Sequence, residues 1–171
     1  MTDAERTLLR RHKVGFVFQR FNLLPAFDAY HNITLAQHIH GSRFDPHRFE
    51  VIADLLGLSN RLHHKPSELS GGEQQRVAIA RAIITEPKLV LADEPTGNLD
   101  SQNSENVLSI LRQLNKDLGQ TLMMITHNLE AAAYGDRILY MRDGVVVEES
   151  PVHHALTVQG TDLHKVASSS R

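Results

Sequence analysis

The sequence predicts an α/β fold built on a parallel sheet, and two observations support this prediction. Short apolar runs typical of buried strands occur at 14–18, 88–92 and 121–126. Segments with helical spacing follow at 72–85 and 101–118. Apolar strands that alternate with helices across short loops are typical of a parallel sheet with helices on its faces.

The segment before the first strand and the segment after it are both expected to be helical. Thr2 and Glu5 have the spacing of a capping box, so a short helix is expected to precede the strand at 14–18. After that strand the apolar loop residues are Phe21, Leu23, Leu24, Pro25 and Phe27. Helical spacing then places Phe49, Ile52, Ala53 and Leu56 on one face, and Gly57 ends that helix. We therefore expect a helical subdomain at about 20–85, inserted between the first two strands.

The later elements have clearer patterns. The helix at 72–85 is apolar nearly all round, so it is expected to be buried. The helix at 101–118 is amphipathic and ends at Gly119, with Val107, Ile110, Leu111, Leu114 and Leu118 on its apolar face. Ile138–Met141 and Val145–Val147 are expected to form a hairpin. Periodicity is lost after Pro151, so we expect one domain at 1–150 and an irregular tail at 151–171.

Composition narrows the classes of function. The 171 residues are 41% hydrophobic and carry a net charge of −2, which gives no global reason to expect nucleic acid as a partner. With no cysteine, disulfides and thiolate metal sites are excluded. Neither a signal peptide nor an apolar run of membrane-spanning length is present, so a cytoplasmic location is expected unless a partner recruits the chain to a membrane.

The run Leu69-Ser70-Gly71-Gly72-Glu73-Gln74-Gln75-Arg76 is typical of a glycine-rich turn that opens into a helix. Ser70 is suited to cap that helix, and the two glycines allow close approach of backbone to a ligand. The unpaired N–H groups and the positive dipole end of a helix start favour an anion, above all phosphate.

The run Leu89-Val90-Leu91-Ala92-Asp93-Glu94 is an apolar strand followed by two carboxylates. A parallel strand delivers such side chains at its carboxyl end, where ligands of α/β folds bind. An Asp-Glu pair at a strand end is, by itself, more often an ordinary surface pair. Beside an anion site, however, two carboxylates are suited to nucleotide and magnesium.

Together these residues resemble the ABC-type ATPases. LSGGEQQR resembles the signature motif of that family, and LVLADEP resembles its Walker B segment. Gln19 resembles the Q-loop glutamine, Gly97-Asn98-Leu99-Asp100 the D-loop, and His127 the switch histidine. The resemblance covers residues 3–149 and is strongest to the branch that powers lipoprotein and macrolide exporters.

The resemblance implies ATP and Mg²⁺ as cofactors and gives each residue a role. It implies that Asp93 and Gln19 contact Mg²⁺, that Glu94 is the general base, and that His127 and Gln19 help to hold the attacking water. The γ-phosphate of a nucleotide bound by the partner subunit is contacted by Ser70, Gly71, Gly72 and Gln74, and Asp100 lies at the dimer seam. The implied partners are a second ATPase subunit and a membrane-spanning transporter subunit at the inner face of the cell membrane, with no nucleic acid.

The Walker A pattern G-x-x-x-x-G-K-[ST] does not occur in the sequence. We therefore expect an incomplete P-loop NTPase (RecA-like) sheet that resembles an N-terminally truncated subunit and is poorly stable alone. Either the sheet has a gap beside the strand at 121–126, or the final hairpin shifts to close it. Such a chain is expected to be inactive by itself. It is then part of an ATP-hydrolysing exporter subunit, a binding module that supplies a signature half-site to a partner ATPase, or a non-functional remnant.

Three other patterns have competing interpretations. Chromosome-maintenance ATPases share the signature and Walker B, but they need a long coiled-coil insertion, and only 50 positions (69 − 19) separate Gln19 from Leu69. The pairs His63-His64 and His153-His154 are interpreted as solvated residues, because adjacent side chains point apart and no carboxylate framework accompanies them. Phe21, Leu23, Leu24 and Phe27 either contact the membrane subunit or form local core.

Overall fold

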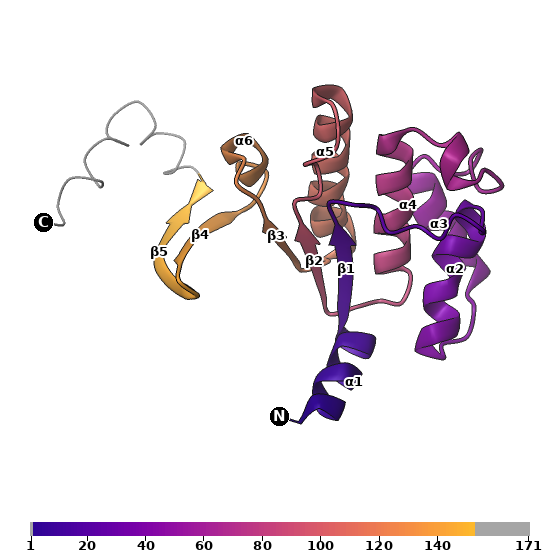
Figure 1. The fold of residues 1–171 in the computed structure, drawn as a ribbon, viewed down its shortest axis with the longest axis horizontal. Helices are drawn as coiled ribbons and strands as arrows, with labels where there is room; N and C mark the ends of the chain where they lie inside the picture. The colour runs from indigo at the N-terminus through magenta and orange to yellow at the C-terminus, as the bar shows by residue number, and fades with distance from the viewer. Residues whose placement is uncertain (1, 153–171) are drawn as a thin grey trace, which may run out of the picture. The chain divides into compact units, whose positions relative to one another are not determined.

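The computed structural model describes residues 2–152. The chain divides into two compact units, the first ending at Thr126 and the second beginning at His127. Each unit is described by itself. The first contains, in order, α1 (Asp3–Lys13), β1 (Val14–Phe18), α2 (Ala29–His40), α3 (Pro46–Leu55), the 3₁₀ turn η1 (Pro66–Glu68), α4 (Gly71–Ile83), β2 (Leu89–Asp93), α5 (Ser101–Leu118) and β3 (Leu122–Ile125) (Figure 1). The second contains α6 (Leu129–Ala132), β4 (Arg137–Arg142) and β5 (Val145–Pro151).

The sheet of the first unit is parallel, with the order β1-β2-β3. Phe16 lies beside Leu91, which lies beside Met123, and this register puts the carboxyl ends of all three strands at one edge. The helices α2, α3 and α4 all fall between β1 and β2 in the chain. The prediction of an α/β fold with a helical insert between the first two strands is therefore confirmed.

One face of this sheet is the core of the unit. Gly15 and Val17 of β1 and Val90 and Ala92 of β2 are buried. Val17, Val90 and Ala92 belong to the same hydrophobic cluster as buried residues of α4 and α5. A methyl group on Gly15 would come within 2.5 Å of the Ala82 carbonyl oxygen, so α4 packs directly on the backbone of β1. Helix α4 is buried as predicted, from Val77 to Ile84 apart from the half-buried Arg81.

The other face of the sheet differs from the prediction that the strands are buried. Phe18, Met123 and Ile125 are 38, 46 and 52% exposed, and side chains alternate between buried and more exposed along β1 and β2. The buried-strand prediction is wrong for this face, because none of the elements within residues 2–126 buries it. In the described residues 2–152, β3 pairs only with β2, as expected from the predicted gap.

Helix α5 begins and ends as predicted. Asp100 caps its start, and Gly119 ends it in the left-handed conformation with φ of 63°. Its buried apolar residues are Val107, Leu108, Leu111 and Leu114, whereas Leu118 is 47% exposed. Leu118, predicted on the same face, lies in the last turn beside an open cavity rather than against the core.

Helix α2 was not predicted from its sequence. Asp28 caps it by accepting a hydrogen bond from the His31 N–H at 2.8 Å, and Gly41 ends it with φ of 78°. Its Asn32 side chain is fully buried, accepts a hydrogen bond from the Leu24 N–H at 2.7 Å, and donates to the carbonyls of Leu24 and Phe27 at 3.1 and 3.0 Å. Asn32 thereby determines the path of the loop that follows Gln19.

That loop divides into two apolar groups. Leu23 packs against the core, and Phe21 approaches Gly71, with its ring carbon 3.7 Å from a methyl placed there. Leu24 and Phe27 are 41 and 39% exposed. The core interpretation therefore applies to Leu23, while Leu24 and Phe27 are available for a partner.

Arg81 of α4 fixes the same loop from the other side. Its guanidinium donates to the carbonyls of Asn22 at 2.7 Å and Phe21 at 3.0 Å. Burial lowers the pKa of Arg81 from its usual value, yet the group stays charged at any physiological pH. The loop after Gln19 is therefore attached to the last turn of the signature helix.

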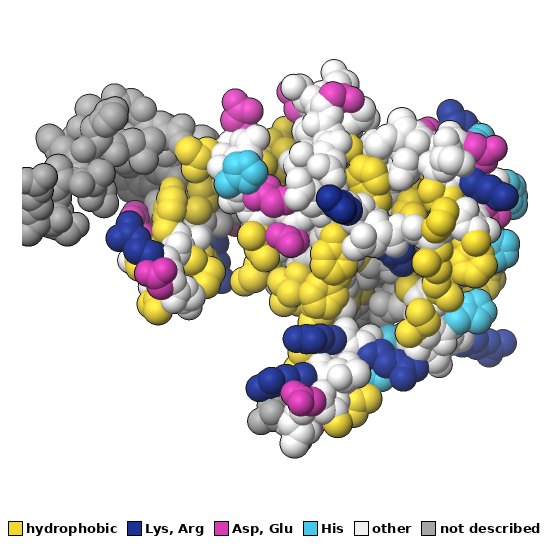
Figure 2. Space-filling model, viewed as in Figure 1, with side chains coloured by type: hydrophobic (Ala, Val, Ile, Leu, Met, Phe, Trp, Pro, Cys, Tyr) yellow, Lys and Arg dark blue, Asp and Glu magenta, His cyan; other side chains and the backbone are white. Residues whose placement is uncertain are grey.

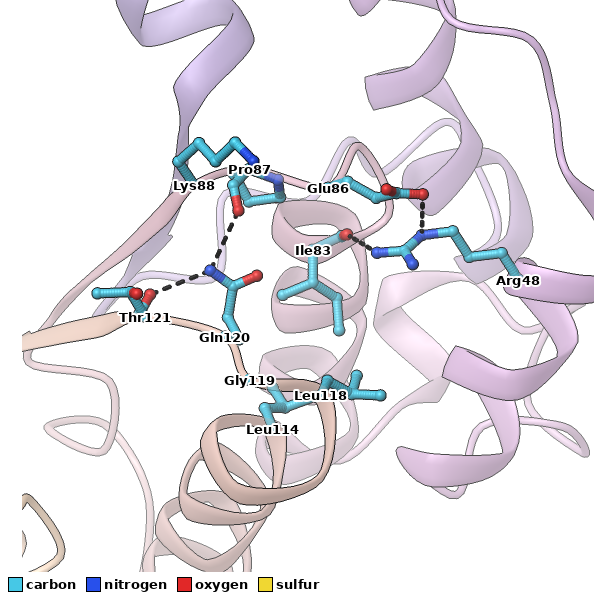
Figure 3. A pocket seen from close by; sticks show the side chains of 10 residues that line it. All are labelled: Arg48, Ile83, Glu86, Pro87, Lys88, Leu114, Leu118, Gly119, Gln120 and Thr121. Carbon is cyan, nitrogen blue, oxygen red and sulfur yellow. Dashed lines mark hydrogen bonds and ion pairs between the residues drawn. The ribbon is translucent and has the colours of Figure 1, made fainter.

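A cavity of about 360 Å³ lies at the amino-terminal end of β2 and β3 (Figure 3). Arg48 of α3 borders the cavity. Its guanidinium donates to the carbonyls of Ile83 at 3.0 Å and Ile84 at 3.3 Å, at the end of α4. The Arg48 Nε also forms an ion pair with the Glu86 carboxylate at 3.4 Å. Gln120 donates to the carbonyls of Pro87 and Thr121. These side chains hydrogen-bond the backbone carbonyls at the end of α4 and before β2 and β3. We therefore interpret the cavity as a place where elements of the fold meet, and not as a ligand site.

The second unit contains the predicted hairpin. Strands β4 and β5 pair antiparallel, from Arg137 beside Pro151 to Arg142 beside Val145, with an irregularity between Tyr140 and Met141. Asp143 and Gly144 turn the chain with φ of 50° and 79°. The strands are longer than predicted, and β5 includes Pro151; the rest of the predicted tail, from residue 153, lies outside the described residues. Among the described residues, no helix has both the length and the apolar character needed to cross a membrane.

Candidate functional site

The candidate site lies at the carboxyl edge of the three-stranded sheet. Gln19 follows β1 directly, Asp93 ends β2, and Glu94 comes next. Phe18 lies beside Asp93, and Asp93 beside Ile125, so the ends of the three strands are adjacent. The parallel sheet therefore brings Gln19, Asp93 and Glu94 together, as the sequence predicted.

Gln19 is connected to the segment 97–100 by a reciprocal pair of hydrogen bonds. Its side-chain amide donates to the Asn98 side-chain oxygen at 3.3 Å, and the Asn98 amide donates to the Gln19 carbonyl at 3.0 Å. Gly97 lies against the same side chain, because a methyl there would come within 2.7 Å of the Gln19 amide nitrogen. Asn98 orients Gln19, a contact that sequence reasoning missed.

Glu94 has a left-handed backbone, with φ of 44°. Such a conformation costs a non-glycine residue on the order of 1 kcal/mol, so surrounding contacts must enforce it. The Glu94 N–H donates to the Ile125 carbonyl at 2.8 Å, and the Thr126 hydroxyl donates to the Glu94 carboxylate at 3.0 Å. The end of β3 therefore sets the direction of the Glu94 side chain, and Thr126 is a second site residue that the sequence did not indicate.

Asp93 differs from Glu94 in its environment. It is exposed, and it lies on the same side of the sheet as Leu91, with which it alternates along β2. Glu94 is half-buried. The edge thus presents one exposed carboxylate and one carboxylate oriented by a neighbouring hydroxyl.

The signature run begins α4 as predicted. Ser70 is the N-cap: its hydroxyl accepts a hydrogen bond from the Glu73 N–H at 3.2 Å, and the Glu73 carboxylate accepts one from the Ser70 N–H at 2.8 Å. Arg61 donates to the other Glu73 oxygen at 2.7 Å. These hydrogen bonds, that of Arg61 foremost, lower the pKa of Glu73 from 4.5 to about 2. The Gln74 side chain donates back to the Leu69 carbonyl at 3.1 Å.

Helices α4 and α5 meet at their amino-terminal ends. Gly72 is buried, and a methyl group on it would lie 2.2 Å from the Asn103 side-chain oxygen. Asn103 donates its backbone N–H and its side-chain amide to the two carboxylate oxygens of Asp100, at 2.9 and 2.7 Å. These bonds lower the pKa of Asp100. Asp100 is therefore held beside the signature glycines, while its predicted place at a dimer seam stays a prediction.

Gln75 joins the parts of this edge. It is fully buried on α4, and its side-chain amide donates to the Pro95 carbonyl at 2.7 Å and the Phe18 carbonyl at 3.3 Å. Within residues 2–152 its side-chain oxygen has no hydrogen-bond partner. Gln75 thus connects the signature helix with the residues just before Gln19 and just after Glu94. A glutamine among buried apolar positions was the signal for it in the sequence.

Two groups of predicted residues lie apart from this description. His127 is the first residue of the second unit, and its role stays a prediction. Among the described residues, no group of three or more His, Cys, Asp or Glu side chains is arranged to hold a metal ion; His63 is 89% exposed, and His153 and His154 lie outside those residues.

The residues at the edge fit a nucleotide with Mg²⁺ in their chemistry. An exposed carboxylate and a side-chain amide oxygen are among the ligands that Mg²⁺ takes in proteins. Helix α4 has 13 residues, and its first N–H groups have no intrahelical partner, so its start favours an anion. The arrangement can therefore contact phosphate from α4 and a metal ion or water from the strand ends.

The sequence profile described as ABC transporter matches residues 1–97, more than half of the chain. The chain belongs to the ABC transporter family. Within that family its relatives are ATP-binding proteins of the lipoprotein-releasing and macrolide-export branch, as the motifs predicted. The lipoprotein-releasing system ATP-binding protein LolD 2 of Rhodopseudomonas palustris is 50% identical over 150 residues, which cover 86% of this chain and 65% of that protein.

Two further relatives extend this comparison. The macrolide export ATP-binding/permease protein MacB of Bdellovibrio bacteriovorus is 42% identical over 85% of this chain and 22% of its own length. A dimeric ATP-binding cassette in a post-hydrolysis state, bound to ADP and Pi, has a TM-score of 0.74 and 39% identity over 89% of this chain and 68% of its own. The chain thus spans about two thirds of the lipoprotein-releasing relative and of the solved cassette.

Proposed function

We propose that this chain acts as part of the ATP-binding and hydrolysing subunit of an exporter-type ABC transporter, and that by itself it does not turn over ATP. One observation carries the proposal: Gln75 joins the signature helix to the strand ends that bear Gln19, Asp93 and Glu94. The phosphate-binding loop pattern does not occur in these 171 residues, so the proposed site is incomplete without a loop from outside them.

The residues of this chain have distinct parts in the proposed reaction. Asp93 holds Mg²⁺ with Gln19 beside it, and Glu94 orients and polarises the attacking water as general base. Thr126 keeps the Glu94 carboxylate in position through its 3.0 Å hydrogen bond. His127 is proposed to contact the γ-phosphate and the water. When bound, Mg²⁺ neutralises charge that develops on the phosphate oxygens.

The start of α4 is proposed to face a nucleotide held by a second ATPase subunit. Ser70, Gly71, Gly72 and Gln74 would contact its γ-phosphate, and Asp100 would lie at the seam between the subunits. For that contact the Gln74 amide must leave the Leu69 carbonyl, which it binds at 3.1 Å. A membrane-spanning transporter subunit completes the assembly at the inner face of the cell membrane, with the exposed Leu24 and Phe27 as candidate contacts.

A second candidate function is a non-catalytic binding module. Two observations favour this function. The start of α4 is held in place by hydrogen bonds within this chain, and no phosphate-binding loop pattern occurs in the sequence. In this role the chain completes the nucleotide site of a full-length partner without holding its own nucleotide. A chain with no function at all is the remaining alternative.

The experiment measures ATP hydrolysis by the purified chain alone and with a full-length LolD-type relative whose own signature serine is replaced. We expect the chain alone to match the buffer background, because positioning of the phosphates supplies nearly all of phosphoryl-transfer catalysis. Turnover by the chain alone that disappears in Glu94→Gln would overturn this expectation.

The mixture separates the two candidates. Turnover that depends on Ser70 of this chain, but not on Glu94, supports the binding module; dependence on both supports a catalytic subunit. Ser70→Arg is compared with Ser109→Arg, which changes an exposed position on α5. No turnover, or turnover insensitive to Ser70→Arg, argues against both candidates.

A further inference from the structure

Arg61 connects the loop at 58–64 to the start of the signature helix. Its Nε donates to one carboxylate oxygen of Glu73 at 2.7 Å, and the other oxygen accepts a hydrogen bond from the Ser70 N–H at 2.8 Å. The Ser70 hydroxyl accepts one from the Glu73 N–H at 3.2 Å, which leaves its own O–H to donate. Glu73 therefore lies between Arg61 and the serine that is proposed to contact phosphate.

The loop that bears Arg61 is fixed to the amino-terminal end of α2. The Ala29 N–H donates to the His64 carbonyl at 2.9 Å. The Tyr30 N–H donates to the Leu62 carbonyl at 2.8 Å. The backbone of α2 thus holds the loop in place, and the Arg61 side chain, which is 44% exposed, reaches from it to α4.

The Glu73 carboxylate brings a negative charge to a helix start that is proposed to bind an anion. Its side chain is only 18% exposed, so water screens this charge incompletely. Hydrogen bonds, that of Arg61 foremost, hold the pKa of Glu73 at about 2, so the group is ionised at neutral pH. A phosphate on Ser70 lies beside this charge and is repelled by it. Binding of phosphate at this position therefore requires a positive charge that compensates Glu73.

We propose that Arg61 is a positioning residue for the signature contact with phosphate, because it neutralises the Glu73 carboxylate beside Ser70. Arg61 acts through Glu73 and not by contact with the phosphate. The inference rests on the proposed function, in which Ser70 contacts a nucleotide phosphate. On the face that Figure 2 shows, basic side chains over the helices α2 to α4 are scattered among acidic and histidine side chains. That distribution favours compensation by a local pair over a broad basic patch.

This role makes a prediction that a merely structural role of Arg61 does not make. Arg61→Ala leaves Glu73 ionised, because the Ser70 N–H still lowers its pKa, and should weaken phosphate binding about threefold or more. Adding Glu73→Gln removes the repelling charge and keeps the capping hydrogen bonds, since glutamine also serves at this position of a capping box. The double variant should therefore bind phosphate as wild type does. A lost structural contact would not be restored in this way.

The test titrates inorganic phosphate into the isotope-labelled full chain at neutral pH and constant ionic strength, without nucleotide or partner. Amide chemical shifts of residues 70–74 report binding, and the rest of each spectrum checks that the variant is folded. Wild type, Arg61→Ala, Glu73→Gln and the double variant are compared. Glu73→Gln alone should bind phosphate at least as tightly as wild type, because Arg61 then has no carboxylate to neutralise at this helix start.

The matched control is Arg43→Ala, which removes the same charge from an exposed position. Arg43 follows the carboxyl end of α2, whereas the loop at 58–64 is bonded to the amino end of that helix. The control should bind phosphate as wild type does.

The inference is wrong if Arg61→Ala binds phosphate as well as wild type, or if Arg43→Ala weakens binding as much. It is also wrong if Glu73→Gln fails to restore binding to Arg61→Ala, or by itself weakens binding. These outcomes leave the proposed contact of Ser70 with phosphate intact. If phosphate shifts no amide of residues 70–74 in any variant, that proposed contact fails, and the role of Arg61 fails with it.

Discussion

The two faces of the sheet have similar apolar side chains and opposite environments. Val17 and Val90 are fully buried, whereas Met123 and Ile125 on the other face are about half exposed. All four belong to short strands whose sequences look equally apolar. The difference shows that the burial of a strand residue is set by the element packed against it, here α4 and α5, and not by the hydrophobicity of the strand.

The largest expected difference in stability is between two isoleucine-to-alanine substitutions, one in the buried helix α4 that covers the sheet and one on the exposed face of the sheet. Ile79→Ala, at a fully buried position of α4, should lower the free energy of unfolding by about 3 kcal/mol through lost contacts and a cavity. Ile125→Ala should lower it by less than about 1 kcal/mol, because its side chain is already half in water. Urea unfolding of both variants measures the difference, and equal losses would mean that the sheet face with Met123 and Ile125 is buried in solution.

The next prediction concerns Gln75, the polar residue on the covered side. Gln75→Leu should destabilise the chain by about 2 kcal/mol, since it leaves the carbonyls of Phe18 and Pro95 without their donor. Gln113→Leu, at an exposed position of α5, is the control and should be near neutral. Denaturant unfolding gives the stability, and amide exchange shows whether the segments around Gln19 and Pro95 loosen. A neutral Gln75→Leu would show that the hydrogen bonds contribute nothing net.

Gly72→Ala should cost about 1 kcal/mol, because the added methyl displaces the Asn103 side chain from Asp100. A double-mutant cycle sharpens this prediction. In an Asn103→Ala background the displaced oxygen is absent, so the cost of Gly72→Ala should shrink. If the cost is the same in both backgrounds, the close approach of α4 and α5 at Gly72 is not its cause.

The last prediction concerns Glu73→Gln, in the first turn of the same helix. The pKa of Glu73 lies at about 2 in the folded chain against an ordinary 4.5, so its carboxylate stabilises the fold above about pH 5. That contribution is lost as the pH falls from 4.5 through 2. Because Arg61 is 44% exposed and solvent screens the pair, we expect a loss of only about 1 kcal/mol at pH 7.

The measurement is urea unfolding of wild type and Glu73→Gln at pH 7 and at pH 2–3. The difference between the two proteins should narrow at the lower pH, where Glu73 is protonated in the unfolded chain. Glu105→Gln, an exposed change on α5, should show no such dependence. A difference that stays constant with pH would mean that the Glu73 charge is not involved.

Much of the fold was predictable because local signals agree with it. Ser70 and Asp100 are strong helix caps, and Gly119 ends α5 where the apolar period stops. Helix α2 was missed because its buried side of Asn32, Thr34 and Gln37 is polar and breaks the apolar period. The exposure of Met123 and Ile125 was missed for a different reason: it depends on what packs opposite, which a strand does not encode.

The place of a residue in the fold was predictable where it belongs to a contiguous motif, as for Ser70 at a helix start and for Asp93 and Glu94 at a strand end. The residues that hold the site together were not. Asn103 acts by filling the space beside Gly72, and Thr126 acts by a hydrogen bond to a residue 32 positions away. Such contacts leave no spacing pattern in the chain, because they form only when separate elements meet. The contact of Ser70, Gln74 and Asp100 with a second subunit, and the role of His127, stay predictions; of these residues, Ser70 is varied in the mixing experiment above.

Helix α4 is attached to its surroundings at three levels. Gln75, near the start of the helix, donates to backbone at the strand ends, and Arg81, in its last turn, donates to the Asn22 carbonyl. Arg48 of α3 donates to the carbonyls at its end. A 13-residue helix is a stiff rod about 20 Å long. Pressure on the loop at Asn22 must therefore tilt the whole rod and displace Ser70 at its tip. A partner that presses on that loop would therefore displace Ser70, and any phosphate bound there, by rigid-body movement of the helix, without rearrangement of the residues in between.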